Sequence, residues 1–196
     1  GLTLGGVGNQ TIVDYVQVSY ANDDSFEWFG GSVNCKHLIS FRTLDDDFDT
    51  DNGYSGKVQF GISLRDSSIA DISKSEAFES DNDANGSSRK TFLQAIDVSA
   101  NNPVAIVPVR TSVVFSNMTL IGPKESATSK GNSLFMAGAQ ISRNSEMSIF
   151  NSVFLGWGGG SVNGLLIDAS KGVPTDLSLA PAGGLNFQNN IIAGPV

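Results

Sequence analysis

A short acidic motif centred on a phenylalanine recurs three times in the first half of the chain, and no other feature constrains the fold as strongly. The three phenylalanines are Phe26, Phe48 and Phe78, which are 22 and 30 residues apart. A repeat of roughly 20 to 30 residues is typical of solenoids, in which each coil carries loops of variable length and packs on its neighbours. The chain is therefore expected to wind as a stack of coils.

Short apolar runs accompany the motif and continue to the end of the chain. The six runs are residues 16–21, 38–42, 60–65, 118–122, 152–156 and 190–194. Each is brief, apolar and bounded by glycine or polar residues, which predicts a strand and not a helix. We therefore expect an all-β fold, a right-handed single-stranded parallel β-helix of about six rungs. Residues 84–113 and 123–145 are expected to be loop excursions from it.

An asparagine stands immediately before each of the last three apolar runs. These residues are Asn117, Asn151 and Asn189. Asparagine tolerates the left-handed backbone conformation that sharp corners need, and equivalent asparagines on stacked coils can hydrogen-bond from rung to rung. The series predicts a corner of the coil and has no direct functional content.

Aligning the three acidic motifs on their phenylalanines places carboxylates in columns. The aligned sets are Asp24, Asp46 and Glu76, then Glu27, Asp49 and Glu79, then Asp51 and Asp81. Parallel strands lie about 4.8 Å apart, so ionised acids in one column would repel one another by several kcal/mol. Three things can offset this repulsion: a divalent cation, a raised pKa, or the neighbouring Arg42 and Arg65.

Two loops contain residues with side-chain oxygens at a spacing that favours calcium binding. Residues 81–86 match the spacing D-x-D-x-N-G, and residues 47–53 approximate it. The predicted ligands are Asp49, Asp51, Asp81, Asp83 and Asn85, with Glu27 and Glu79 nearby. A full EF-hand loop would need a glutamate at position 12, where this chain has Phe92, so solvated turn residues remain an alternative. No other cofactor is expected.

The remaining conspicuous side chains are aromatic or stand alone. Trp157 lies in a run of glycines that would leave its indole uncovered, and Tyr54 follows the second acidic motif. Both are candidates for contact with sugar rings, with core packing as the alternative. His37 and Cys35 lack the partners that a nucleophilic pair or a zinc site needs, so we interpret them as rung and core residues.

The charge balance limits the class of partner. The formal net charge is −8, and most of the acids lie in the first half of the chain. An acidic surface repels phosphate backbones and anionic lipids, so we expect no nucleic-acid partner. The chain has no apolar run of about 18 residues, so no direct membrane insertion is expected within it.

Three stretches carry a family resemblance. They are VDYVQVSYANDD at 13–24, KHLISFRT at 36–43 and DDFDTDNGYSG at 46–56. They resemble rungs of secreted or surface-anchored lipoproteins of gut-type Bacteroidetes, which are similar in fold to pectate lyases. The resemblance covers residues 1 to about 170 of this chain. The resemblance implies an extracellular or outer-membrane surface location, a lipid anchor upstream, and one β-helix domain over residues 1–196 that is part of a longer solenoid.

The resemblance also implies a chemistry. Pectate-lyase-like enzymes hold Ca²⁺ on stacked acids and use an arginine or lysine as the base. The resemblance gives the base role to Arg42 or Arg65 and the metal role to the stacked acids Asp24, Glu27, Asp46, Asp49 and Glu79. Surrounding carboxylates raise the pKa of an arginine further, which disfavours that role. We therefore expect a non-catalytic protein that binds a polysaccharide or another cell-surface component and has a cation-stabilised acidic face. The alternatives are a Ca²⁺-dependent polysaccharide lyase or other carbohydrate-active enzyme, and a structural adhesin or spacer.

Overall fold

The chain alternates between two parallel sheets that face each other across the core. The computed structural model describes residues 1–86, 110–124, 128, 131–158, 161–180 and 183–194. The first sheet has six strands, in the order β1 (Leu2–Gly5), β3 (Phe26–Phe29), β5 (Phe48–Asp51), β7 (Ser75–Ser80), β10 (Phe135–Ile141) and β13 (Asn163–Ile167). Every strand pair in it is parallel, as stacked coils require.

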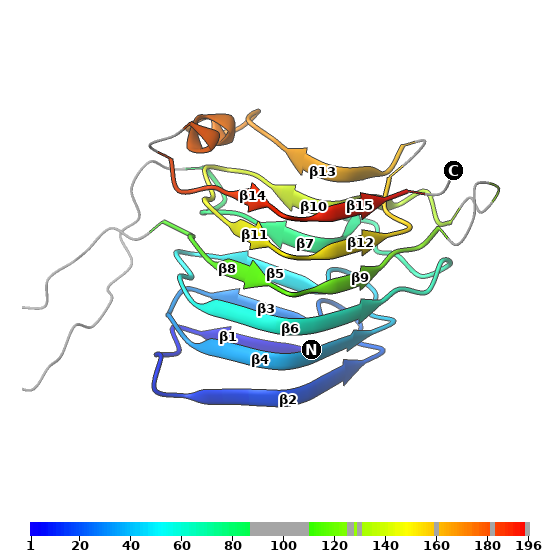
Figure 1. Ribbon diagram of the computed structural model, residues 1–196, viewed down its shortest axis with the longest axis horizontal. Helices are drawn as coiled ribbons and strands as arrows, with labels where there is room; N and C mark the ends of the chain where they lie inside the picture. Colours follow the sequence, from blue (N-terminus) through cyan, green and yellow to red (C-terminus); the bar gives the residue numbers. More distant parts are fainter. Residues whose placement is uncertain (87–109, 125–127, 129–130, 159–160, 181–182, 195–196) are drawn as a thin grey trace, which may run out of the picture.

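The second sheet completes each coil. Its first three rungs are the long strands β2 (Ile12–Ser19), β4 (Asn34–Phe41) and β6 (Lys57–Leu64). Its later rungs each have two short strands, β8 (Val114–Ser116) with β9 (Thr119–Ile121), β11 (Ser148–Phe150) with β12 (Val153–Leu155), and β14 (Phe187–Gln188) with β15 (Ile191–Ala193). The rungs stack in sequence order (Figure 1), which confirms the predicted all-β parallel β-helix.

The repeated phenylalanines form the centre of the core. The register pairs Phe26 with Phe48 and Phe48 with Phe78, and their rings stack at centroid distances of 5.6 and 5.5 Å. Trp28 is also fully buried and stacks on Tyr54 at 5.3 Å. The sequence repeat therefore predicted the register of the first sheet correctly, because each phenylalanine can pack inward only at the same point of its coil.

Each rung of the second sheet bends at one residue in the left-handed conformation. These residues are Tyr15, His37, Phe60, Asn117, Asn151 and Asn189, with φ between 51° and 63°. The prediction of a left-handed corner at the three asparagines is thus confirmed, and the amide oxygen of Asn117 accepts a hydrogen bond from Gln59 at 3.0 Å. In the first three rungs the same corner carries an aromatic ring instead.

One predicted excursion is wrong in part. Residues 123–145 contain β10, which pairs with β7 on one side and β13 on the other and so belongs to the coil. Its sequence is FMAGAQI, in which small residues take the place of large ones, so Ala139 stands opposite Phe78. Of the other predicted excursion, residues 87–109 lie outside the described residues.

Helix is almost absent from the described residues. The single helical element there is the 3₁₀ turn η1 (Thr175–Leu179), near the last rung. Within the part of the chain that the structure describes, no helix is long and apolar enough to cross a membrane.

Candidate functional site

One column of carboxylates runs across the outer side of β3, β5 and β7. The register pairs Glu27 with Asp49 and Asp49 with Glu79, which confirms the predicted alignment. Polar residues of the flanking rungs close the column at both ends: the Thr3 hydroxyl donates to Glu27, and the Gln140 amide donates to Glu79, each at 3.0 Å. Asp49 is the central member, with an acid on either side.

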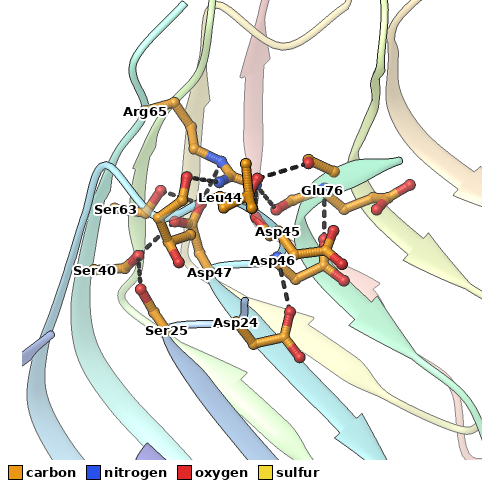
Figure 2. A network of polar contacts seen from close by, with 12 residues as sticks. Asp24, Ser25, Ser40, Leu44, Asp45, Asp46, Asp47, Ser63, Arg65 and Glu76 are labelled. Atoms are coloured by element: carbon orange, nitrogen blue, oxygen red, sulfur yellow. Dashed lines mark hydrogen bonds and ion pairs between the residues drawn. The ribbon is translucent and has the colours of Figure 1, made fainter. Parts of the chain in front are cut away.

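A second column lies where the chain enters these strands. The backbone N–H of Asp46 donates to Asp24 Oδ1 at 2.9 Å, and the backbone N–H of Glu76 donates to Asp46 Oδ1 at 2.6 Å (Figure 2). Asp24 and Asp46 therefore each accept a hydrogen bond from the backbone of the next rung. We call the surface formed by both columns the acidic face; its residues are Asp24, Glu27, Asp46, Asp49, Glu76 and Glu79.

The acids of this face hold protons more tightly than free carboxyl groups. Burial, with repulsion from neighbouring acids, raises the pKa of Asp24 to about 7. Burial raises the pKa of Glu76 to about 8, although a hydrogen bond with the Asp46 carboxyl acts in the opposite direction. Burial and the charges of Glu76 and Glu79 raise the pKa of Asp46 well above its usual range. A raised pKa is thus one of the three expected remedies for the repulsion.

Arginine supplies a second remedy, but at a neighbouring residue. The Arg65 guanidinium is fully buried, and its Nε lies 3.2 Å from Asp47 Oδ2. Arg65 also donates to the backbone carbonyls of Thr43 at 3.1 Å, of Glu76 at 2.7 Å, and of Asp45. The side chain of Arg65 is thus enclosed among protein groups, which weighs further against a role as a base.

Two serines complete the surroundings of the buried Asp47 carboxylate. Ser40 donates to its Oδ1 and Ser63 to its Oδ2, both at 2.5 Å, and Ser25 lies 2.6 Å from Ser40 (Figure 2). Burial raises the pKa of Asp47, while Arg65 and the two serines oppose that rise. The arrangement is a buried ion pair that ties successive rungs together.

The other candidate base, Arg42, lies at the end of β4 in the second sheet. Its side chain is 41% exposed, and its guanidinium lies 3.7 Å from Asp66 and over the ring of Phe41. It forms an exposed ion pair, which contributes little to stability. Arg42 and Arg65 follow equivalent positions on adjacent rungs, as predicted, yet only Arg65 turns inward.

Three acids come close enough together to bind a cation. Carboxylate oxygens of Asp24, Glu27 and Asp49 all lie within 4.8 Å of one another, and a second set consists of Asp23, Asp24 and Asp45. Hard oxygen ligands of this kind suit Ca²⁺. Glu27 and Asp49 are among the predicted metal residues, and Asp24 is one of the stacked acids for which the resemblance implies a metal-binding role.

The other predicted calcium ligands make different contacts. Asp81 accepts a hydrogen bond from Ser142 and pairs with Arg143. Asp83 accepts the backbone N–H of Asn85 at 2.8 Å, and Asp51 accepts that of the next residue at 2.5 Å. Neither three-acid set contains Asp51, Asp81 or Asp83. Calcium binding stays a prediction, and the acids that the structure brings together lie at the acidic face and not in the 81–86 loop.

The structure corrects the prediction of sugar contacts at Trp157 and Tyr54, because both side chains are fully buried. The Tyr54 hydroxyl donates to the Val33 carbonyl at 2.7 Å inside the core. A Cβ atom at Gly122 would lie 2.8 Å from the Trp157 ring. Glycine thus makes room for the indole and does not expose it.

Exposed aromatic rings occur elsewhere, at the left-handed corner of the first three rungs. Tyr15 is 78% exposed and Phe60 is 44% exposed. The ring of His37 lies between them, at centroid distances of 4.4 Å from Tyr15 and 5.3 Å from Phe60. The sequence contained a signal for this column, since these residues occupy the corner position that asparagine occupies in later rungs.

The comparisons with known proteins concern the same part of the chain. A family model described as a pectate-lyase like beta helix domain matches residues 1–162. Neither a curated protein nor a solved structure matches the chain. The matched residues include the whole acidic face and the exposed aromatic column.

Proposed function

Because the chain belongs to the family of pectate-lyase-like β-helix domains, we propose that it is an extracellular or cell-surface protein that binds a carboxylated polysaccharide through calcium. The observation that carries this proposal is the cluster of Asp24, Glu27 and Asp49, whose oxygens lie within 4.8 Å of one another. Glu27 and Asp49 are paired in register on β3 and β5, which fixes the spacing of their carboxylates, and Asp24 lies two residues before β3.

The surroundings of the cluster support a cation there. Asp47 is neutralised by Arg65, and Asp81 by Arg143. Within the described chain, no arginine or lysine forms an ion pair with Asp24, Glu27 or Asp49. Bound Ca²⁺ would supply the missing positive charge and would lower the pKa of each carboxyl that it contacts.

Calcium would also explain how an acidic surface binds an acidic polymer. Ca²⁺ takes six to eight oxygen ligands, and the three carboxylates of the cluster need not supply all of them. Positions left over are open to water and to the carboxylate of a uronate residue. The ion would thus turn a repulsive surface into an attractive one for a carboxylated polysaccharide.

The position of the arginines supports binding over cleavage. A lyase needs a base near the proton that it removes. Arg65 is enclosed with Asp47, and Arg42 pairs with Asp66 in the second sheet. We therefore propose a binding protein, with the Ca²⁺-dependent lyase as the second candidate that the same experiment tests.

The test is calorimetric titration of the protein with polygalacturonate oligomers, once with Ca²⁺ and once with excess chelator. Binding that requires Ca²⁺ is expected. Asp49→Asn and Glu27→Gln should each weaken it at least about tenfold, since a ligand charge is lost. Asp168→Asn, in a turn outside the acidic face, makes the same charge change and should leave binding intact.

Two results would contradict the proposal. Equal binding with chelator would remove the role of calcium, and equal binding by Asp49→Asn would remove the acidic face. Ultraviolet absorbance of the same mixtures tests cleavage, because a lyase releases unsaturated sugars. Its appearance would replace the binding proposal with the lyase.

A further inference from the structure

A groove lies on the outside of the second sheet, along its left-handed corner. It has a volume of about 550 Å³ and crosses β2, β4, β6 and β9, which stack side by side in Figure 1. Its floor is the chain at Val16, Leu38 and Gly61, which are paired in register. We call it the corner groove. The corner groove lies on the second sheet, whereas the acidic face lies on the first, and the two share no residue.

One wall of the corner groove is the aromatic column. Tyr15, His37 and Phe60 stack with interplanar angles of 9° and 11°. His37 Nδ1 also lies 2.7 Å from Asp14 Oδ1, so a carboxylate fixes the orientation of its ring. Asn117 continues this wall on the next rung.

The aromatic residues of this wall carry a conformational cost. A left-handed conformation costs a non-glycine residue about 1–2 kcal/mol, and asparagine is among the side chains that tolerate it best. The later rungs have asparagine at this corner, whereas the first three have bulky rings with φ of 54°, 51° and 63°. Strained residues of this kind cluster at sites that bind ligands.

The opposite wall follows the next outward position of each rung. It consists of Gln17, Ile39, Ile62 and Thr119, which pair in register from β2 to β9. Ile62 is 46% exposed although it is aliphatic. The walls therefore present apolar surface interrupted by amide, imidazole and hydroxyl groups.

The composition of the corner groove indicates the charge of its ligand. Among the described residues that line it, none is an aspartate, glutamate, lysine or arginine. A charged group would lose its hydration there without gaining an ionic partner, which is unfavourable. The ligand that fits is neutral, with apolar surface and many hydroxyl groups.

We propose that the corner groove binds a neutral oligosaccharide. A pyranose ring has apolar C–H faces that can contact Phe60 and Ile62, and hydroxyl groups that can hydrogen-bond to Gln17, His37 or Asn117. A chain running along the solenoid axis meets an equivalent pair of walls at every rung, about 4.8 Å apart. This site needs no cation and is independent of the acidic face.

The single histidine of the chain makes the test specific to this groove. The imidazole signals of His37 are followed by NMR in excess chelator during titration with cellohexaose, xylohexaose and mannohexaose. At least one sugar is expected to shift them in a saturable way. Phe60→Ala should weaken binding about tenfold, through loss of roughly 50 Å² of apolar contact at about 25 cal/mol per Å².

Matched variants separate the groove from other effects. Ile72→Ala removes an apolar side chain that is 87% exposed outside the groove, and should leave sugar binding unchanged. Asp49→Asn should also leave it unchanged, since the acidic face is separate. Tyr15→Ala serves as a second groove variant with the same expected loss, and circular dichroism shows whether each variant folds.

Three results would overturn the proposal. The first is no shift of the His37 signals with any of the sugars at millimolar concentration. The second is a shift with hexanol alone, which would indicate a purely apolar occupant. The third is a shift that depends on protein concentration without ligand, accompanied by a dimer in sedimentation, which would make the groove a contact between copies.

Discussion

Glu76→Gln is expected to stabilise the protein, although it alters a buried side chain of the acidic face. Glu76 is only 2% exposed, and burial raises its pKa from 4.5 to about 8. Its Oε1 is a buried oxygen with no hydrogen-bond donor in the described structure. Glutamine has the same shape and no charge, so it removes the repulsion with Glu79 and Asp45 and leaves the backbone hydrogen bonds in place.

The size of the effect follows from the pKa. Each pH unit between the unfolded and the folded pKa costs about 1.4 kcal/mol of stability, because the folded state holds a proton that the unfolded chain releases. For Glu76 this cost begins near pH 4.5 and is complete near pH 8. The variant should therefore match the wild type near pH 4 and exceed it by on the order of 4 kcal/mol near pH 8.

The assay is urea denaturation from pH 4 to pH 8 in excess chelator, so that no cation masks the effect. Asp47→Asn is the control, since it also neutralises one buried acid beside the same turn. It should destabilise the protein by about 3–5 kcal/mol, because it leaves the enclosed Arg65 without its partner. Two similar substitutions thus have opposite expected signs.

The reasoning would be refuted if Glu76→Gln were less stable than the wild type at pH 8, or if the difference did not grow with pH. Either result would mean that Glu76 is ionised without cost in the folded protein. A stabilising Asp47→Asn would refute the assignment of the ion pair in the same experiment.

Three further predictions concern the metal and the core. Ca²⁺ should raise the melting temperature by several degrees relative to chelator, and more at pH 8 than at pH 5 because protons compete for the same carboxylates; equal melting curves would exclude a native site. Gly61→Ala should cost about 1–3 kcal/mol in urea denaturation, since its Cβ would lie 2.2 Å from Met118 Cε, and shortening the methionine to valine should recover part of that loss. Phe48→Ala should cost about 3–5 kcal/mol in the same assay, because Phe48 stacks between two other phenylalanines; a loss below 1 kcal/mol would contradict the central position of the column.

The register of the first sheet could be predicted because it depends on a local pattern. Three successive coils repeat a phenylalanine with acids on both sides, so aligning Phe26, Phe48 and Phe78 also aligns the carboxylates. The two columns of the acidic face follow from that alignment alone. The strand β10 escaped prediction because its coil has Ala139 where earlier coils have phenylalanine.

The pairing of individual side chains could not be predicted in the same way. Arg42 and Arg65 follow equivalent strand positions, but only Arg65 meets a buried carboxylate, and the turn that brings Asp47 to it has no sequence signature. The glycines beside Trp157 in the sequence do not expose its ring. In the folded chain two distant glycines, Gly122 and Gly138, lie against Trp157 and leave room for it in the core.

At the left-handed corner, the residues that favour the stability of the fold differ from those that favour ligand binding. Asparagine adopts the left-handed conformation at little cost in free energy, and the later rungs have asparagine at this corner. The first three rungs have aromatic rings there, which are suited to ligand contact and poorly suited to that conformation. If the protein were evolved for heat resistance alone, with no ligand to bind, Tyr15, His37 and Phe60 should be replaced by asparagine one rung at a time. Ligand binding would then be the selective pressure that keeps aromatic rings at this corner.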